Sequence, residues 1–270
     1  MSCIHIQRRE LILPKRQRGF FAPAAISSAF RVGAGDFDGT NDYMTRGAGL
    51  TGAADSKSGI LSVWVRLDAG LGTQRLIGSS ASAGTSADRW RASRISLSGP
   101  FLIVGNNASG TIILQITSTT SYGASATWLH LLASWNLATA AAHLYVNGVD
   151  DLAGGGTLTN DTIDYTVGDW GVGGDSNAGN KLDGCLSELY LATGQYLDFS
   201  VAANLRKFIT ASGRPAYLGR DGSKPTGTQP IMYLHLNKNE AVANLATNRG
   251  SGGDPSITGA LVAADTSPSG

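Results

Sequence analysis

The stretch HLYVNGV at residues 143–149 decides the fold class of this 270-residue chain. It places Asn147-Gly148 between two apolar segments. The two central residues of a tight hairpin turn need positive φ angles, which Asn and Gly adopt more easily than other residues do. The stretch therefore predicts two antiparallel β-strands joined by a two-residue turn.

Short apolar runs of the same character lie on both sides of this hairpin, separated by Gly, Asn, Asp and Ser. Glycine supplies 36 of the 270 residues and charged residues only 15%. A chain of this composition spends many residues on turns, which favours a β-sandwich or barrel over a helical bundle. The predicted strands are residues 60–67, 94–104, 111–117, 128–135, 143–146, 182–191, 231–236 and 256–262.

The sequence divides into three parts. Residues 1–35 form a basic, Pro-interrupted N-terminal arm, residues 36–199 carry most of the predicted strands, and residues 200–270 form a C-terminal extension. The extension contains one predicted short helix over residues 201–209, capped by Ser200 and stopped before Gly213, because Ser favours N-caps and Gly ends helices. We expect its strands to pack back on the central part.

The arm differs in charge from everything that follows it. Residues 1–31 contain six Lys or Arg against Glu10 alone, a net charge of +5, whereas the remainder is −4. The arm also holds apolar side chains that a free tail would not keep exposed. We therefore predict that it contacts neighbouring subunits, through Ile4, Arg8, Arg9, Leu11, Leu13, Arg16, Arg18, Phe20 and Phe21.

Two other partners of a basic arm are less favoured. Interleaved aromatic residues, which platforms for single-stranded nucleic acid use, are missing, so no nucleic-acid partner is expected. No run approaches the about 20 apolar residues that a membrane span needs, and no signal-peptide run follows the basic residues. No membrane partner is expected, and the chain is expected to stay where it is made unless the cell lyses.

Five motifs, in this order, resemble those of laminin-G-like, concanavalin A-like jelly-roll proteins. They are FDGTNDY at 37–43, SVWV at 62–65, the Trp-His strand at 128–135, LYVNG at 144–148, and the closing glycines and strand at 173–189. The resemblance implies an all-β, two-sheet antiparallel jelly-roll sandwich, with Trp64 facing inward. Ser187 stands where the family has Asp, so any role of that carboxylate is lost.

The tail runs from Arg206-Lys207-Phe208 through Gly219–Gly227 and Thr247–Gly259. It is similar to extensions of laminin-G-like proteins of tailed bacteriophages and prophages. This resemblance implies a non-enzymatic virion structural protein, made in the host cytoplasm, that decorates the exterior of the capsid, neck or collar, or tail. Its partners would be other virion proteins and copies of itself. The alternative is a carbohydrate-binding, lectin-like module of a fibre or collar that recognises a host surface glycan.

Catalysis is not expected, although the resemblance extends to glycan hydrolases. Retaining glycosidases need two carboxyl groups about 5 Å apart, which laminarinase-type relatives carry as Glu-x-Asp-x-x-Glu on one strand. The three glutamates of this chain, Glu10, Glu188 and Glu240, belong to no such motif.

One loop and one aromatic residue are candidate ligand sites. Oxygen-rich flexible loops suit Ca²⁺, which takes about 6–8 oxygen ligands, but the same residues suit any turn. No cofactor is required, and the candidate calcium ligands are Asp169, Asp175, Asn177, Asn180 and Asp183. Trp90, between Arg89 and Arg91, is a candidate stacking platform for a sugar or a partner; otherwise it covers a sheet edge.

The cysteines and one histidine have simpler interpretations. Cys3 and Cys185 are expected to be two free thiols, or Cys3 is expected to form an inter-subunit disulfide.

His130 alternates with apolar neighbours on a predicted strand, so we expect a packed, hydrogen-bonded core histidine.

Overall fold

The computed structural model describes residues 32–69, 72–80, 88–236 and 244–270. The predicted oligomer contacts between Ile4 and Phe21, and Cys3, lie outside the described residues.

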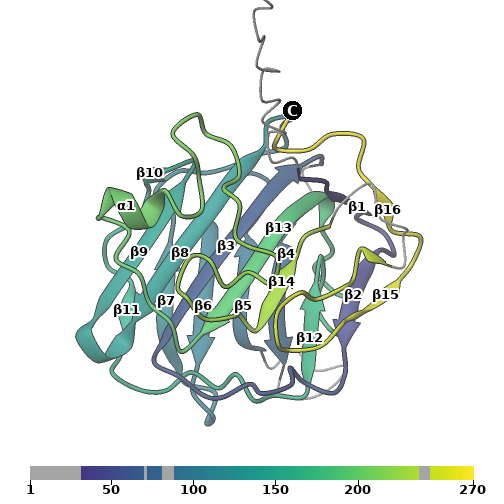
Figure 1. Cartoon of the computed structure of the whole chain (residues 1–270). Helices are drawn as coiled ribbons and strands as arrows, with labels where there is room; N and C mark the ends of the chain where they lie inside the picture. Colours follow the sequence, from purple (N-terminus) through teal and green to yellow (C-terminus); the bar gives the residue numbers. More distant parts are fainter. Residues whose placement is uncertain (1–31, 70–71, 81–87, 237–243) are drawn as a thin grey trace, which may run out of the picture.

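Two antiparallel sheets of eight strands each are stacked face to face (Figure 1). The first sheet runs β10 (Val149–Asp150), β9 (Ala141–Val146), β8 (Leu129–Asn136), β3 (Ser58–Leu67), β13 (Asp183–Thr193), β1 (Gly35–Asp38), β16 (Val262–Ala263), with β14 (Met232–Leu234) also paired to β13. The second runs β11 (Thr157–Leu158), β7 (Ile112–Thr117), β6 (Phe101–Asn106), β5 (Asp88–Arg94), β4 (Gln74–Ser80), β12 (Asp169–Val172), β2 (Tyr43–Arg46), β15 (Ser256–Thr258). The predicted all-β, two-sheet sandwich is confirmed.

The hairpin at 143–149 forms as its sequence predicts. Asn147 and Gly148 have φ angles of 52° and 79°, and Val149 pairs with Val146 across the turn. The Asn147 side chain also accepts a hydrogen bond from the His130 amide at 2.8 Å, which ties the turn to β8.

Three predicted elements differ from the structure. Residues 256–262 are not one strand, because β15 pairs in the second sheet and β16 in the first. Residues 94–104 are not one strand: the chain turns after β5, where the Ile95 amide donates to the Pro100 carbonyl, and β6 follows. The predicted helix over 201–209 shrinks to α1 (Ala202–Leu205). Ser200 does not cap it, because its hydroxyl bonds to Asp198 instead.

Besides α1, the helical structure described includes a 3₁₀ turn, η1 (Leu137–Thr139). No helix within the described ranges has both the length and the apolar character needed to cross a membrane.

The main core lies between the two sheets and follows the two-residue period of the strands. On β3, Leu61, Val63 and Val65 point into this core, whereas Ile60 and Trp64 point to the opposite face. Trp64, expected to face inward, therefore lies on the outer face of the first sheet.

A second core forms where the C-terminal extension covers that outer face. Phe199, Phe208 and Tyr233 pack there against Trp64 and Tyr190. In Figure 1 the green segment that follows β13 passes over the strands of the first sheet. Since β14, β15 and β16 each pair with strands of the central part, the extension is built into both sheets.

Candidate functional site

Trp90 lies in the main core and offers no surface to a ligand. Its exposure is 0%, and its ring stacks on Trp135 at 5.8 Å between ring centroids. The prediction of an exposed stacking platform is wrong, because alternation along β5 turns Trp90 inward and sends Arg89 and Arg91 outward.

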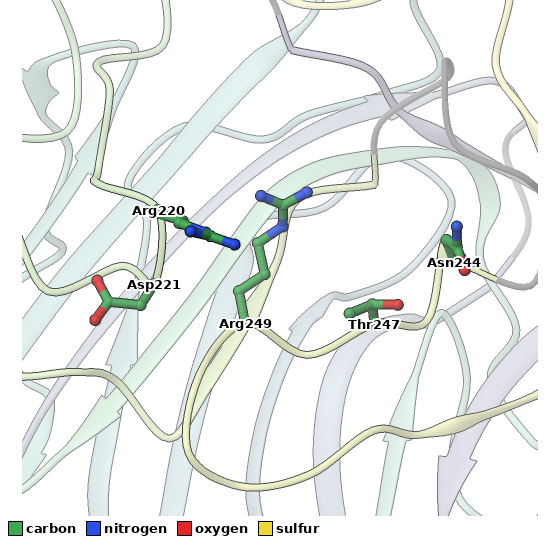
Figure 2. A pocket seen from close by; sticks show the side chains of 5 residues that line it. All are labelled: Arg220, Asp221, Asn244, Thr247 and Arg249. Carbon is green, nitrogen blue, oxygen red and sulfur yellow. The ribbon is translucent and has the colours of Figure 1, made fainter.

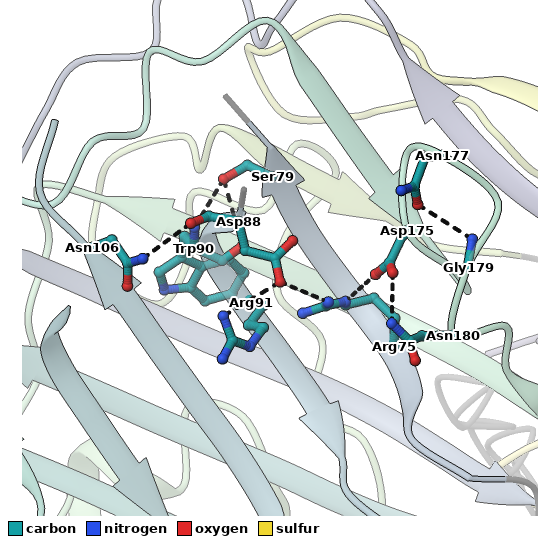
Figure 3. Close-up of polar contacts among 10 residues, drawn as sticks. All are labelled: Arg75, Ser79, Asp88, Trp90, Arg91, Asn106, Asp175, Asn177, Gly179 and Asn180. Carbon is teal, nitrogen blue, oxygen red and sulfur yellow. Dashed lines mark hydrogen bonds and ion pairs between the residues drawn. The ribbon is translucent and has the colours of Figure 1, made fainter. Parts of the chain in front are cut away.

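A network around Arg75 occupies the place where calcium ligands were predicted (Figure 3). The Arg75 guanidinium donates to Asp175 at 2.5 Å and to Asp88 at 2.9 Å, and Arg91 reaches Asp88 at 3.3 Å. The second oxygen of Asp175 accepts from the Asn180 amide at 2.6 Å. Both carboxylate oxygens of Asp175 are thus already bonded, and a guanidinium supplies the positive charge.

The five predicted calcium ligands do not converge. Asp175, Asn177 and Asn180 share one loop, in which Asn177 accepts from the Gly179 amide. Asp169 lies buried on β12 of the second sheet, and Asp183 lies on β13 of the first sheet. The five-residue ligand set is therefore wrong, and the loop's polar groups are used to hold its own shape.

A different acidic cluster forms at the start of β13. Within the described part of the chain, one group of three potential metal ligands comes together, with the ligand atoms of Asp36, Asp68 and Cys185 within 4.8 Å of one another. Asp68 is paired with Arg66 at 2.6 Å, and the Cys185 thiol donates to Asp36. Burial raises the pKa of the Cys185 thiol, and burial followed by the neighbouring aspartates raises the pKa of Asp183. These groups bond among themselves, and Cys185 is buried as a free thiol.

Glu188, the one glutamate within the described residues, is buried beneath the extension. It is 1% exposed, and it sits with a φ of 49° where the pairing of β13 with β3 shifts register. The Tyr233 hydroxyl donates to its carboxylate at 2.7 Å, and His235 forms an ion-pair contact with its other oxygen. The side chain thus joins β13 to β14 and does not reach solvent.

Two pockets open on the surface of the extension. The larger, of about 570 Å³, is lined by Arg220, Asp221, Asn244, Thr247 and Arg249. Figure 2 shows the Arg220 guanidinium pointing toward Arg249, while the Asp221 carboxylate points away. The arrangement offers guanidinium, amide and hydroxyl groups to one concave space.

The second pocket, of about 370 Å³, combines an aromatic ring with cations. Its lining includes Arg206, Lys207, Tyr217 and Lys224. Tyr217 is 47% exposed, and the Lys224 ammonium lies 5.3 Å from the centre of its ring. Neither pocket is among the sites that the sequence predicts. The available signal was the charge of residues 200–236, where five Lys or Arg face Asp221 alone.

Comparison with solved structures shows the fold. A candidate carbohydrate-binding protein from Bacteroides ovatus superposes with a TM-score of 0.60 at 15% identity, over 87% of this chain. The chain spans 60% of that protein's length. A heptameric pentraxin from Limulus polyphemus has a TM-score of 0.48 at 14% identity, covering 65% of this chain and 82% of the pentraxin.

A third similar structure is domain 4 of an extracellular arabinanase from Geobacillus stearothermophilus, in complex with arabinotriose. Its TM-score is 0.45 at 14% identity, covering 64% of this chain and 75% of that domain. No curated protein matches the chain in sequence.

The family profile of the concanavalin A-like lectin/glucanase superfamily, in its laminin-G form, matches residues 38–194. These residues include the five motifs in their expected order, except for Phe37 of the first, and most strands of both sheets. The chain therefore belongs to the concanavalin A-like lectin/glucanase superfamily.

Proposed function

We propose that this chain is a non-catalytic, lectin-like module that binds a glycan at the pockets of its C-terminal extension. The observation that carries the proposal is the half-exposed Tyr217 ring at the wall of a pocket with polar side chains. Sugar sites combine an apolar ring face, which covers the C–H face of the sugar, with a few convergent polar groups for its hydroxyls.

The surfaces of the two sheets, as far as the structure describes them, are less suited to a sugar, which supports a site in the extension. The outer face of the first sheet is covered by Phe199, Phe208 and Tyr233 of the extension and what precedes it. On the second sheet, Trp90 is buried and the Arg75 network directs its donors to its own carboxylates. The extension is where an aromatic ring and polar groups border the same hollow.

The carboxylates near these pockets suit binding rather than glycoside hydrolysis. Glu188 is buried and engaged by Tyr233 and His235. Asp221 is the one carboxylate lining the two pockets. Hydrogen bonds from Ser223 lower its pKa, whereas a general acid needs a raised pKa and a second carboxylate beside it.

Binding to a panel of acidic and neutral bacterial polysaccharides tests the proposal. We expect Tyr217→Ala to weaken binding about tenfold, equivalent to about 1.4 kcal/mol, which is within the range of aromatic contacts. Tyr217→Phe, which keeps the ring, should bind like the wild type. Leu97→Ala, at an exposed apolar residue in the turn between β5 and β6, is the control for surface truncation.

The same incubations test the absence of catalysis, because hydrolysis would release reducing ends. Turnover that is abolished by substituting a single Asp would contradict the non-catalytic part of the proposal. Failure to bind any glycan of the panel would contradict the binding part.

The virion role stays a prediction from the sequence. Its support is the basic, apolar arm, of which residues 1–31 lie outside the described ranges, and the resemblance of the tail to phage proteins. A glycan-binding module of a fibre or collar would satisfy both that prediction and the proposal made for the pockets.

A further inference from the structure

Charge is distributed unevenly between the jelly roll and the extension. Residues 32–199 contain eight Lys or Arg against fifteen Asp or Glu, a net charge of −7, whereas residues 200–270 contain seven against four, a net charge of +3. The two pockets lie in the positive part. A ligand that approaches them meets a local field opposite in sign to that of the neighbouring jelly roll.

Four arginines of the jelly roll are paired with carboxylates. Arg66, Arg75, Arg89 and Arg91 each have a carboxylate oxygen within 3.4 Å. These side chains are structural cations, because their charge is neutralised by a carboxylate of the same chain.

Four cations that line the pockets differ from these arginines. Among the described residues, no carboxylate forms an ion pair with Arg206, Lys207, Arg220 or Lys224. The nearby Asp221 accepts from the amide and hydroxyl of Ser223 instead. Residues 32–199 have acidic residues in excess, yet no carboxylate of the described residues forms an ion pair with these four cations.

One anchored loop serves both pockets. The loop brings Lys224 back beside Tyr217, because the Lys224 amide donates a hydrogen bond to the Leu218 carbonyl at 3.0 Å. Leu218 is 2% exposed and belongs to the second core. Gly222 has a φ of 79°, and a Cβ there would lie 2.8 Å from Pro230, so the loop packs closely on its support. Arg220, in the same loop, lines the other pocket.

We infer that the ligand of this surface is an acidic glycan, whose successive sugar residues place anionic groups in the two pockets. This inference rests on the proposed function and adds the charge class of the ligand. Arg206, Lys207 and Lys224 would bind one acidic group beside the Tyr217 ring, and Arg220 and Arg249 would bind the next (Figure 2).

Two other anionic partners fit the surface less well. Single-stranded nucleic acid binds through a series of stacking rings, and the two pockets offer one, Tyr217. The acidic face of a second copy would be a broad protein surface, whereas concave pockets of about 370 and 570 Å³ suit small groups such as sugar rings.

Titration calorimetry of the full chain with four probes tests the inference. The probes are an oligogalacturonate (carboxylate), a heparin oligosaccharide (sulfate), a neutral malto-oligosaccharide and a single-stranded DNA of similar charge. We expect an acidic oligosaccharide to bind at least tenfold more tightly than the neutral one, and its affinity to fall as salt rises. The first two probes distinguish carboxylate from sulfate recognition.

The outcomes separate the two proposals. Binding of the neutral oligosaccharide alone would overturn the acidic ligand and keep the glycan-binding function. Absence of binding to every glycan would overturn both. Tighter binding of the DNA than of both acidic oligosaccharides would replace the acidic glycan with a nucleic acid.

A charge-matched pair of variants locates the site. Lys207→Gln with Lys224→Gln should weaken binding of the acidic oligosaccharide at least tenfold, and Arg220→Gln should weaken it through the other pocket. Lys57→Gln with Lys181→Gln removes the same charge from the jelly roll and should leave the affinity unchanged. Equal losses in both double variants, with unchanged melting temperatures, would show a nonspecific charge effect and overturn the site.

Discussion

His130 lies on β8 without exposed surface, held from two sides. Its Nε2 atom is 2.8 Å from the Ser62 hydroxyl, and its ring stacks on Trp64 with 4.6 Å between centroids. Burial lowers the pKa of His130 to about 3, because no carboxylate compensates the desolvation of a charged imidazole. The packed core histidine predicted from strand alternation is confirmed.

This lowered pKa predicts a pH-dependent stability. The unfolded chain takes up the proton near its ordinary pKa of about 6.5, whereas the folded chain does so only near 3. His130 should therefore contribute full stability above about pH 6.5 and lose up to about 1.4 kcal/mol per pH unit below it. Urea unfolding at pH 7 and pH 4 measures the difference, which His130→Gln should reduce.

His143→Gln is the control, since His143 is partly exposed and contacts Asp198 at 3.2 Å. If His130→Gln keeps the wild-type pH dependence between pH 7 and pH 4, this explanation is wrong.

Strand β14 is joined to β13 by backbone pairing and by one buried carboxylate contact. The extension reaches Glu188 through the Tyr233 hydroxyl, and both side chains are at most 1% exposed. A buried carboxylate that loses a hydrogen-bond donor costs more than an exposed one, because no water replaces the donor. The contact thus contributes to holding the extension, and with it the two pockets, on the first sheet.

Tyr233→Phe should lower the free energy of unfolding by about 1.5–3 kcal/mol, the value of a hydrogen bond to a charged group. Tyr43→Phe is the matched control, because Tyr43 is partly exposed on β2 and its hydroxyl forms no hydrogen bond with another described residue. Urea denaturation of both variants measures the effect. Equal stabilities for the two variants would show that the hydroxyl contributes nothing to the extension's attachment.

For the individual strands, the alternation of residues between the two faces of a sheet explains which elements the sequence predicts well. On β3 the two-residue period is regular, whereas on β13 it is interrupted at Glu188, so that Leu186 and Leu189 both face the main core. The predicted bounds of both strands lie within a few residues of those in the structure. The turn between β5 and β6 was missed because the apolar Ile95 and Leu97 continue the pattern through it, although Leu97 is 62% exposed.

The site was harder to predict than the strands. The arginines beside Trp90 suggested an exposed position, but Arg89 is paired with Asp164, which lies far away in the sequence. Such a partner is brought near only by the sheet pairing. The cations of the pockets likewise come together because one loop folds back on the second core, which no local pattern reveals.

At the scale of the whole molecule, the chain is attached to the sandwich from its first described residue, Val32. The Val32 amide donates to the Ser269 hydroxyl at 3.1 Å, and Val32 and Ala34 are buried. The last residues of the arm are thus fixed to the sandwich. A deletion that stops at residue 30 leaves these contacts and both sheets intact.

The arm itself is predicted to fasten the protein to its neighbours. Its charge of +5 is complementary to the −7 of residues 32–199, so a second copy offers a matching surface. Charge would orient the contact, while burial of the arm's apolar side chains at about 25 cal/mol per Å² would supply most of the affinity. Deleting residues 2–30 should therefore leave a folded chain that no longer self-associates, as measured by sedimentation and by the melting temperature. A full-length chain that is already monomeric would contradict contact between copies. A truncated chain that associates like the full-length one would show that the contact surface lies outside the arm.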